Sequence, residues 1–230
     1  DYRGKPALVI CPTSLVDNWV REAAQFTPNM KVLAMKGGDR HDNFDSIPEY
    51  NLVITSYALI RRDVEHYRKF VFSAIILDEA QNIKNRATQN ATAVKLLNGG
   101  NHFVLTGTPM ENSVADLWSI MDFLMPGYLG HYDEFKANYE IPLAVPGDTI
   151  YETAQIKLRR KLHPFLLRRK KIDVAKDLPP KMVKISWCSL SQDQRTVYDK
   201  IMNASRDEIR SIVQKDGFEK SRMVILSALL

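Results

Sequence analysis

Two adjacent carboxylates, Asp78 and Glu79, directly follow the apolar run 74–77. A short apolar run without alternation is typical of an inner strand of a parallel sheet, and ligands of such sheets bind beyond the carboxyl ends of the strands. In a nucleotide hydrolase of this design, one carboxylate holds Mg²⁺ and its neighbour accepts a proton from the attacking water. An isolated Asp-Glu pair is more often a solvated turn at the end of a strand, so the rest of the chain decides between these interpretations.

Polar residues also follow other apolar runs of the chain. Because the carboxyl ends of parallel strands meet at one edge of a sheet, we expect these residues to lie beside the acidic pair. Hydroxyls, a glycine and helix starts at such an edge can sense a phosphate group or bind the backbone phosphates of a nucleic acid. The residues are Pro12, Thr13, Ser14, Thr55, Ser56, Tyr57, Thr106, Gly107 and Thr108. Taken alone, Ser14 is the N-cap of a helix.

The spacing of apolar residues predicts strands that alternate with helices, which is typical of an α/β fold with a doubly wound parallel sheet. Trp19 shares one helical face with Leu15 and Ala23, so we interpret it as a core residue. A Gly99-Gly100 pair is expected to end the third helix. Strands are predicted at 7–11, 31–35, 51–55, 74–78 and 102–106, and helices at 14–26, 57–70, 88–97 and 114–124.

The pattern changes after residue 125. Shorter helices at 132–139 and 153–162, joined by a Pro- and Gly-bearing loop, indicate a helical insertion. A basic connector then leads to an alternating stretch at 183–188, which predicts a half-buried strand, and to helices at 192–213 and 223–230. Three parts are therefore expected: 1–125, a helical insertion at 126–164, and 165–230.

Composition agrees with an ordinary globular protein, since 45% of the 230 residues are apolar and 26% are charged. No apolar run approaches the ~20 residues that cross a membrane. The formal net charge of +5 slightly favours an acidic partner such as nucleic acid. Cys11 and Cys188 lack metal-ligand spacing, so we expect two buried free thiols in a reducing compartment. The chain has no signal peptide and no initiator Met, and we expect it to be a piece of a longer protein.

Several blocks, in order along the chain, resemble the motifs of the Swi/Snf-type helicase-like ATPases, which are double-stranded DNA translocases of helicase superfamily two. The block Asp78-Glu79-Ala80-Gln81 is similar to their motif II, with Gln where the family often has His. An amide donates and accepts hydrogen bonds but is not protonated. The change from His to Gln therefore bears on the pH dependence of the activity and not on the activity itself. Residues 8–19 resemble motif Ia, 55–57 motif Ib, 77–85 motif II, 105–112 motif III, and 165–169 with 178–181 the bridge into a second RecA-like lobe.

This resemblance implies a RecA-like fold and a role for each matching residue. Asp78 would bind Mg²⁺ through water, and Glu79 would activate water at the γ-phosphate of ATP. Gln81, Thr106, Gly107 and Thr108 would complete the nucleotide site, with the two threonines coupling it to DNA. Sequence-independent contacts to the phosphate backbone of double-stranded DNA would come from Pro12, Thr13, Ser14, Thr55, Ser56, Tyr57, Lys84 and Asn85, and contacts at the lobe junction from Arg168 and Arg169.

One family element is absent from the sequence, the phosphate-binding Walker A loop Gly-x-x-x-x-Gly-Lys-Ser/Thr. We therefore expect a partial first RecA-like lobe and the start of a second one, from a parent protein that hydrolyses ATP although the fragment does not. A monomer is expected, in the bacterial cytoplasm at the nucleoid or in a eukaryotic nucleus.

Two alternatives stay open at this point. A strand-separating helicase of the same superfamily would share motifs Ia to III, although the insertion at 128–164 and the Arg168-Arg169 bridge argue against it. A degenerate lobe that only binds DNA or protein would lack a Walker A lysine in the longer protein.

Overall fold

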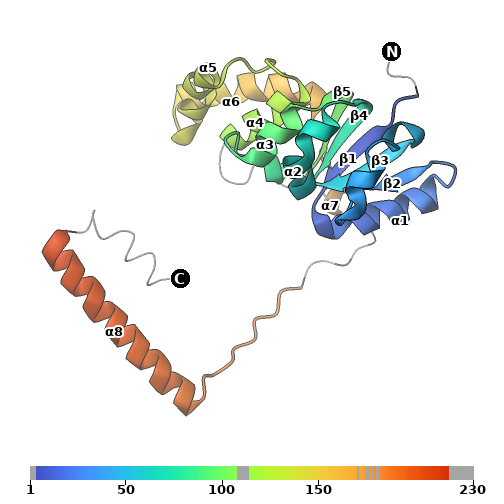
Figure 1. Cartoon of the computed structure of the whole chain (residues 1–230). Helices are drawn as coiled ribbons and strands as arrows, with labels where there is room; N and C mark the ends of the chain where they lie inside the picture. Colours follow the sequence, from blue (N-terminus) through green and yellow to red (C-terminus); the bar gives the residue numbers. More distant parts are fainter. Residues whose placement is uncertain are drawn as a thin grey trace. The chain divides into compact units, whose positions relative to one another are not determined.

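A computed structural model describes residues 4–107, 114–169, 171–174, 177, 179 and 182–217. The chain forms two compact units, Asp1–Leu167 and Arg168–Leu230 (Figure 1). The first unit contains the sheet with the helices around it, and the second contains one long helix. No helix among the described residues has the length and apolar character needed to cross a membrane.

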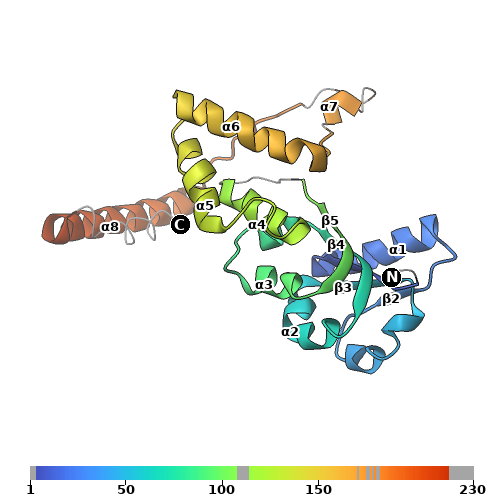
Figure 2. The same cartoon turned by 90° about the horizontal axis from the view of Figure 1, so that it is seen from above.

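The first unit is built on a sheet of five strands in the order β2-β3-β1-β4-β5, and each neighbouring pair is parallel (Figure 1). Figure 2 shows the same sheet from above. Parallel strands need crossover connections. Here α-helices supply them, except between β2 and β3, which are joined through the 3₁₀ turns Asp39–Asn43 and Ile47–Glu49, and this confirms the predicted doubly wound α/β fold. The strands are β1 (Ala7–Cys11), β2 (Val32–Ala34), β3 (Leu52–Ser56), β4 (Val71–Asp78) and β5 (Asn98–Leu105).

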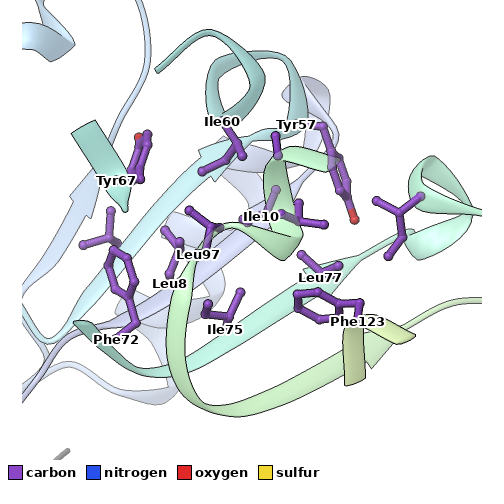
Figure 3. Close-up of a cluster of buried hydrophobic side chains, with 14 of the residues drawn as sticks. Leu8, Ile10, Tyr57, Ile60, Tyr67, Phe72, Ile75, Leu77, Leu97 and Phe123 are labelled. Carbon is purple, nitrogen blue, oxygen red and sulfur yellow. The ribbon is translucent and has the colours of Figure 1, made fainter. Parts of the chain in front are cut away.

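Helices cover both faces of this sheet. On one face, α1 (Val16–Phe26) packs on Val9, Cys11 and Ile54. On the other face, helices α2 to α4 enclose the main core, in which Leu8, Ile75 and Leu77 are fully buried (Figure 3). Each such side chain stabilises the fold by about 1.5–3 kcal/mol. These helices are α2 (Tyr57–Tyr67), α3 (Gln89–Lys95) and α4 (Val114–Leu124).

The register brings the carboxyl ends of the strands to one edge. Cys11 of β1 lies opposite Ser56 of β3, and Asp78 of β4 lies opposite Leu105 of β5. The residues that follow these strands therefore share this edge of the sheet.

A second core lies around α4, and it includes the residues of the predicted helices after residue 125. Leu117 and Met121, on the face of α4 that turns away from the sheet, pack with Phe135 and Leu158. The first predicted helix is α5 (Tyr132–Phe135), which continues as a π-helical turn, Lys136–Glu140. The second is α6 (Thr149–Leu162), and it begins earlier than predicted because Asp148 caps it through the N–H of Tyr151.

Two local predictions in the first unit are wrong. Ser14 does not cap a helix: Thr13–Leu15 forms a 3₁₀ turn, closed by the N–H of Leu15 on the carbonyl of Pro12, and α1 starts after it without a side-chain cap. Gly99 does not end a helix, because α3 ends at Lys95 and Gly99 lies within β5. A Cβ at Gly99 would stand 2.7 Å from the Ile75 side chain, so a larger residue there would displace this buried side chain of β4.

In the second unit, the helix predicted at 192–213 is α8 (Gln192–Asp216), opened by a capping box between Ser191 and Gln194. The strand predicted at 183–188 is wrong: residues 182–190 are irregular, and Trp187 is 90% exposed. A stretch with alternating apolar residues forms a stable strand only beside another strand, and the described residues of this unit provide none.

Cys188 is exposed, so only Cys11 is a buried thiol. The short α7 (Lys171–Val174) follows the first residues of the unit, and the helix predicted at 223–230 lies outside the described residues.

Candidate functional site

The acidic pair lies where β4 leaves the sheet. Asp78 is the last residue of β4, and Glu79 has φ 51° and ψ 55°, the only non-glycine residue with positive φ in the described part of the chain. A left-handed conformation costs a residue with a side chain roughly 1–2 kcal/mol. Strain of this kind is concentrated at functional sites, and here it turns the chain abruptly between two adjacent carboxylates.

Asp78 is fixed at three of its oxygen atoms. Its Oδ2 accepts a hydrogen bond from the indole Nε1–H of Trp19 at 2.8 Å, and its Oδ1 accepts one from the backbone N–H of Glu79 at 2.9 Å. Its main-chain carbonyl accepts a third bond from the hydroxyl of Tyr57 at 2.9 Å. The carboxylate is half-buried and its orientation is set by α1 and by the turn itself.

Glu79 is held by a different set of partners. Gln81 donates from Nε2 to Oε2 of Glu79 at 2.9 Å, and the hydroxyl of Thr106 donates to Oε1 of Gln81 at 3.2 Å. The structure therefore brings together four of the predicted nucleotide-site residues from the ends of β4 and β5. Gly107 follows in an exposed position, and Thr108 lies outside the described residues.

The carboxylates of this pair suit a magnesium ion. Mg²⁺ prefers oxygen ligands, keeps several of its waters and is usually bound by one or two carboxylates. Each carboxylate oxygen of Asp78 accepts the one hydrogen bond described above and keeps further lone pairs. No group of three or more His, Cys, Asp or Glu side chains that could hold a metal occurs among the described residues.

Burial keeps the nearby thiol and phenol protonated. It raises the pKa of Cys11 to about 12, and the negative charge of Asp78 adds to this increase. The pKa of Tyr57 is also raised, first by burial and then by the charges of Asp78, Cys11 and Glu79. Because thiolates and not thiols are nucleophiles, Cys11 is inert near neutral pH.

The three predicted DNA-binding residues at the end of β3 do not present their side chains to solvent. Thr55 is 0% exposed and donates to the carbonyl of Met35, Ser56 is 2% exposed and caps α2 at the N–H of Leu59, and Tyr57 is 4% exposed. Their contact with DNA phosphates stays a prediction, although these hydroxyls are turned inward in this structure. Each hydroxyl satisfies a backbone group inside the fold instead.

Other predicted DNA-binding residues are accessible. Thr13 and Ser14 are exposed in the 3₁₀ turn before α1, and Asn85 is exposed in the loop after the acidic pair. Lys84 is half-buried, as is Pro12. Pro12 and Thr13 line a cavity of about 260 Å³, and the remaining lining residues are Tyr57, Ala58, Arg61, Asn82 and Asn90.

Sequence reasoning missed several residues at this edge. Arg61 lies one helical turn after Tyr57 and brings a cation to the cavity, and the i, i+4 spacing was the available signal. Asn90 contributes a buried Oδ1 that has no hydrogen-bond partner among the described residues. Trp19 packs against the core under α1, as predicted, but its ring N–H reaches Asp78, which helical spacing alone does not reveal.

Arg168 and Arg169 are the first residues of the second unit, and both are exposed. Their assignment to a lobe junction stays a prediction.

Comparison with known proteins places this site in a family. The sequence profile described as SNF2-related domain matches residues 2–230. The chain belongs to the SNF2-related domain family. Its relatives include the TATA-binding protein-associated factor BTAF1 of Arabidopsis thaliana, 36% identical over 92% of this chain. A putative ATP-dependent helicase/translocase of Bacillus subtilis, YwqA, is 36% identical over 96% of it.

The fold is also similar to that of a solved SWI2/SNF2 protein. The SWI2/SNF2 ATPase core of Sulfolobus solfataricus, solved in complex with double-stranded DNA, matches 98% of this chain with a TM-score of 0.68 and 36% identity. This SNF2-related chain covers 46% of that solved chain, and it spans only 11% of BTAF1 and 24% of YwqA. It corresponds to a part of these longer relatives.

Proposed function

We propose that this SNF2-related chain forms the hydrolytic edge of a DNA-dependent ATPase that moves along double-stranded DNA without separating the strands. The observation that carries the proposal is the acidic pair at the end of β4, in which Asp78 and Glu79 are held by separate hydrogen-bond partners. The relatives support it, since YwqA is named an ATP-dependent helicase/translocase and the Sulfolobus core was solved with double-stranded DNA.

In this proposal the two carboxylates have different tasks. Asp78 holds Mg²⁺ through water, and the ion neutralises charge on the phosphates of ATP. Glu79 accepts the proton of the attacking water. Thr106, linked to Glu79 through Gln81, makes the position of Glu79 sensitive to the end of β5. Gly107 and Thr108 belong to the same nucleotide site.

The neighbouring cavity supplies the DNA contacts. Thr13 offers a hydroxyl at its rim and Arg61 a guanidinium, both suited to phosphate oxygens. Such contacts carry no base information, so binding is sequence-independent and weakens as salt rises. Ser14, Lys84 and Asn85 extend this surface along the same edge.

We propose that ATP turnover requires parts of the longer protein, and that the 230-residue chain alone is inactive. Within it, residues 1–125 are part of the first RecA-like lobe, 126–164 a helical insertion and 165–230 the connection into the second lobe, with Arg168 and Arg169 at the junction. The whole protein is a monomer that acts where its DNA lies, at the bacterial nucleoid or in a nucleus.

Replacement of Glu79 tests the catalytic assignment. Glu79→Gln in the full-length protein keeps the size of the side chain but removes the proton acceptor, so the ATP hydrolysis rate falls by about 10²–10⁴-fold. The matched control is Glu65→Gln, which changes an exposed carboxylate on α2 that pairs with Arg68 and leaves turnover unchanged. Equal rates for the two variants would refute the role of Glu79.

A further inference from the structure

Trp19 connects a helix on one face of the sheet to the acidic pair. It lies on α1, 59 positions before Asp78, and the distance from its Nε1 to Oδ2 of Asp78 is 2.8 Å. Its ring is half-buried and packs against the apolar cluster formed by Val9, Cys11 and Ile54. Tertiary packing therefore sets the direction of the N–H.

An indole has properties that suit it to orient a carboxylate. It is a donor only, it does not titrate, and its two side-chain torsions are limited by packing. A hydrogen bond from an N–H to an ionised carboxylate is about twice as strong as one between neutral groups. Since Oδ1 of Asp78 already accepts the N–H of Glu79, the indole fixes the second oxygen and stops the carboxylate from rotating.

We propose that Trp19 is the positioning residue for the Mg²⁺-binding carboxylate. It holds the Asp78 carboxylate in one orientation and leaves further lone pairs on both oxygens for the ion. The inference rests on the proposed function, because it assigns a partner to the metal-binding residue of that same site. Residues of this kind form hydrogen bonds to a metal ligand without binding the metal. Their replacement changes metal affinity or activity by about 10–100-fold.

The first test compares two tryptophan variants in the full-length protein. Trp19→Phe keeps an aromatic ring and loses the N–H, and the expected result is a 10–100-fold increase in the Mg²⁺ concentration for half-maximal ATP turnover. The matched control is Trp118→Phe, which removes the indole N–H that donates to the carbonyl of Gly130 at 3.2 Å in the helical insertion. Both variants lose a packing and hydrogen-bonding group, but only Trp19→Phe changes the Mg²⁺ requirement.

The second test needs no turnover and uses the unmutated protein. Fluorine NMR of 5-fluorotryptophan-labelled protein reports on each indole, and the Trp19 signal is assigned by its loss in Trp19→Phe or, if that variant does not fold, in Trp19→Tyr. Mg²⁺ with a non-hydrolysable ATP analogue is expected to shift the Trp19 signal and to leave that of Trp118 in place.

The outcomes separate the two claims. No Mg²⁺-dependent ATP turnover in the unmutated protein would overturn the proposed function. Turnover in the unmutated protein with an equal Mg²⁺ requirement in Trp19→Phe and Trp118→Phe would overturn the role of Trp19 alone. If neither Trp19 variant folds, the fluorine signal of Trp19 is assigned by elimination, from Phe variants of Trp118, Trp187 and every other tryptophan of the full-length protein. Movement of the Trp19 signal with Mg²⁺ and nucleotide supports the inference, and a signal that does not move overturns it.

Discussion

Glu79 shows how neighbouring residues at a strand end take up different environments. Consecutive side chains of a strand point to opposite faces, but the left-handed conformation of Glu79 breaks this alternation directly after Asp78. Asp78 then meets Trp19 of α1, and Glu79 meets Gln81. The residue types predicted the acidic site. The partners were not predictable, because they depend on a backbone conformation that glutamate rarely adopts.

The two cysteines provide a test of burial at the site. Burial raises the pKa of Cys11 to about 12, so Cys11 remains a thiol at pH 8, whereas Cys188 is exposed. In the native chain at pH 8, a thiol reagent is expected to label Cys188 alone, and to label both residues in urea. Mass spectrometry of the labelled peptides measures this. Cys188→Ser serves as the control, and rapid native labelling of Cys11 would contradict the burial of the strand end.

Arg61 provides the residue-scale test of the DNA surface. Arg61→Ala in the full-length protein is expected to weaken duplex binding equally for unrelated sequences, and to reduce the slope of log K against log salt by about one, because one phosphate contact is lost. Fluorescence anisotropy at several salt concentrations measures both. The control is Arg62→Ala, an exposed neighbour that does not line the cavity. Equal affinities and slopes for the two variants would exclude Arg61 from the interface.

At the scale of elements, the sequence predicted every strand of the sheet and the helices α1 to α4, because apolar runs and helical periodicity both reflect burial in a sheet covered by helices on both faces. The predictions of local structure were wrong where contacts between distant residues determine that structure. Gly99 has the sequence signature of a helix end, yet it serves the close packing of β5 on Ile75. Val183 alternates like a strand residue but is 74% exposed, since no described strand lies beside it.

A buried ion pair between two elements also escaped prediction. Arg40, in the 3₁₀ turn Asp39–Asn43, donates from Nε and Nη2 to the carboxylate of Asp63 on α2 at 2.6 and 3.1 Å, and this bond raises the pKa of Arg40. Asp63 departs from helical geometry, with φ −114° and ψ 19°. The pair therefore joins the loop after β2 to the kink of α2.

Removing one partner of this pair leaves the other charge buried. Asp63→Ala in this chain is expected to reduce the free energy of unfolding by about 3–5 kcal/mol. Urea unfolding followed by circular dichroism measures the change. Glu65→Ala is the control, because Glu65 pairs with Arg68 in an exposed position and such pairs contribute at most about 1 kcal/mol. A similar loss for both variants would show that the Arg40–Asp63 pair has no special structural role.

At the scale of the whole molecule, the order of the motif-like blocks predicted the family, and the SNF2-related profile confirms it over residues 2–230. Order along the chain does not show which side chains face solvent. The residues of the 55–57 block are in place at the sheet edge, but their hydroxyls bond inward, and Arg61 and Trp19 contribute where no motif was predicted. The sequence thus identified the edge of the sheet, while packing determined which side chains act there.

Stimulation of ATP hydrolysis by duplex DNA tests the proposed function most directly. The steady-state hydrolysis rate of the full-length protein is measured with and without blunt double-stranded DNA at increasing salt. We predict that duplex DNA raises the rate, and that the stimulation declines with salt because the contacts are to phosphates. A hydrolysis rate that is the same with and without duplex DNA at low salt would contradict a DNA-dependent ATPase at this edge of the sheet.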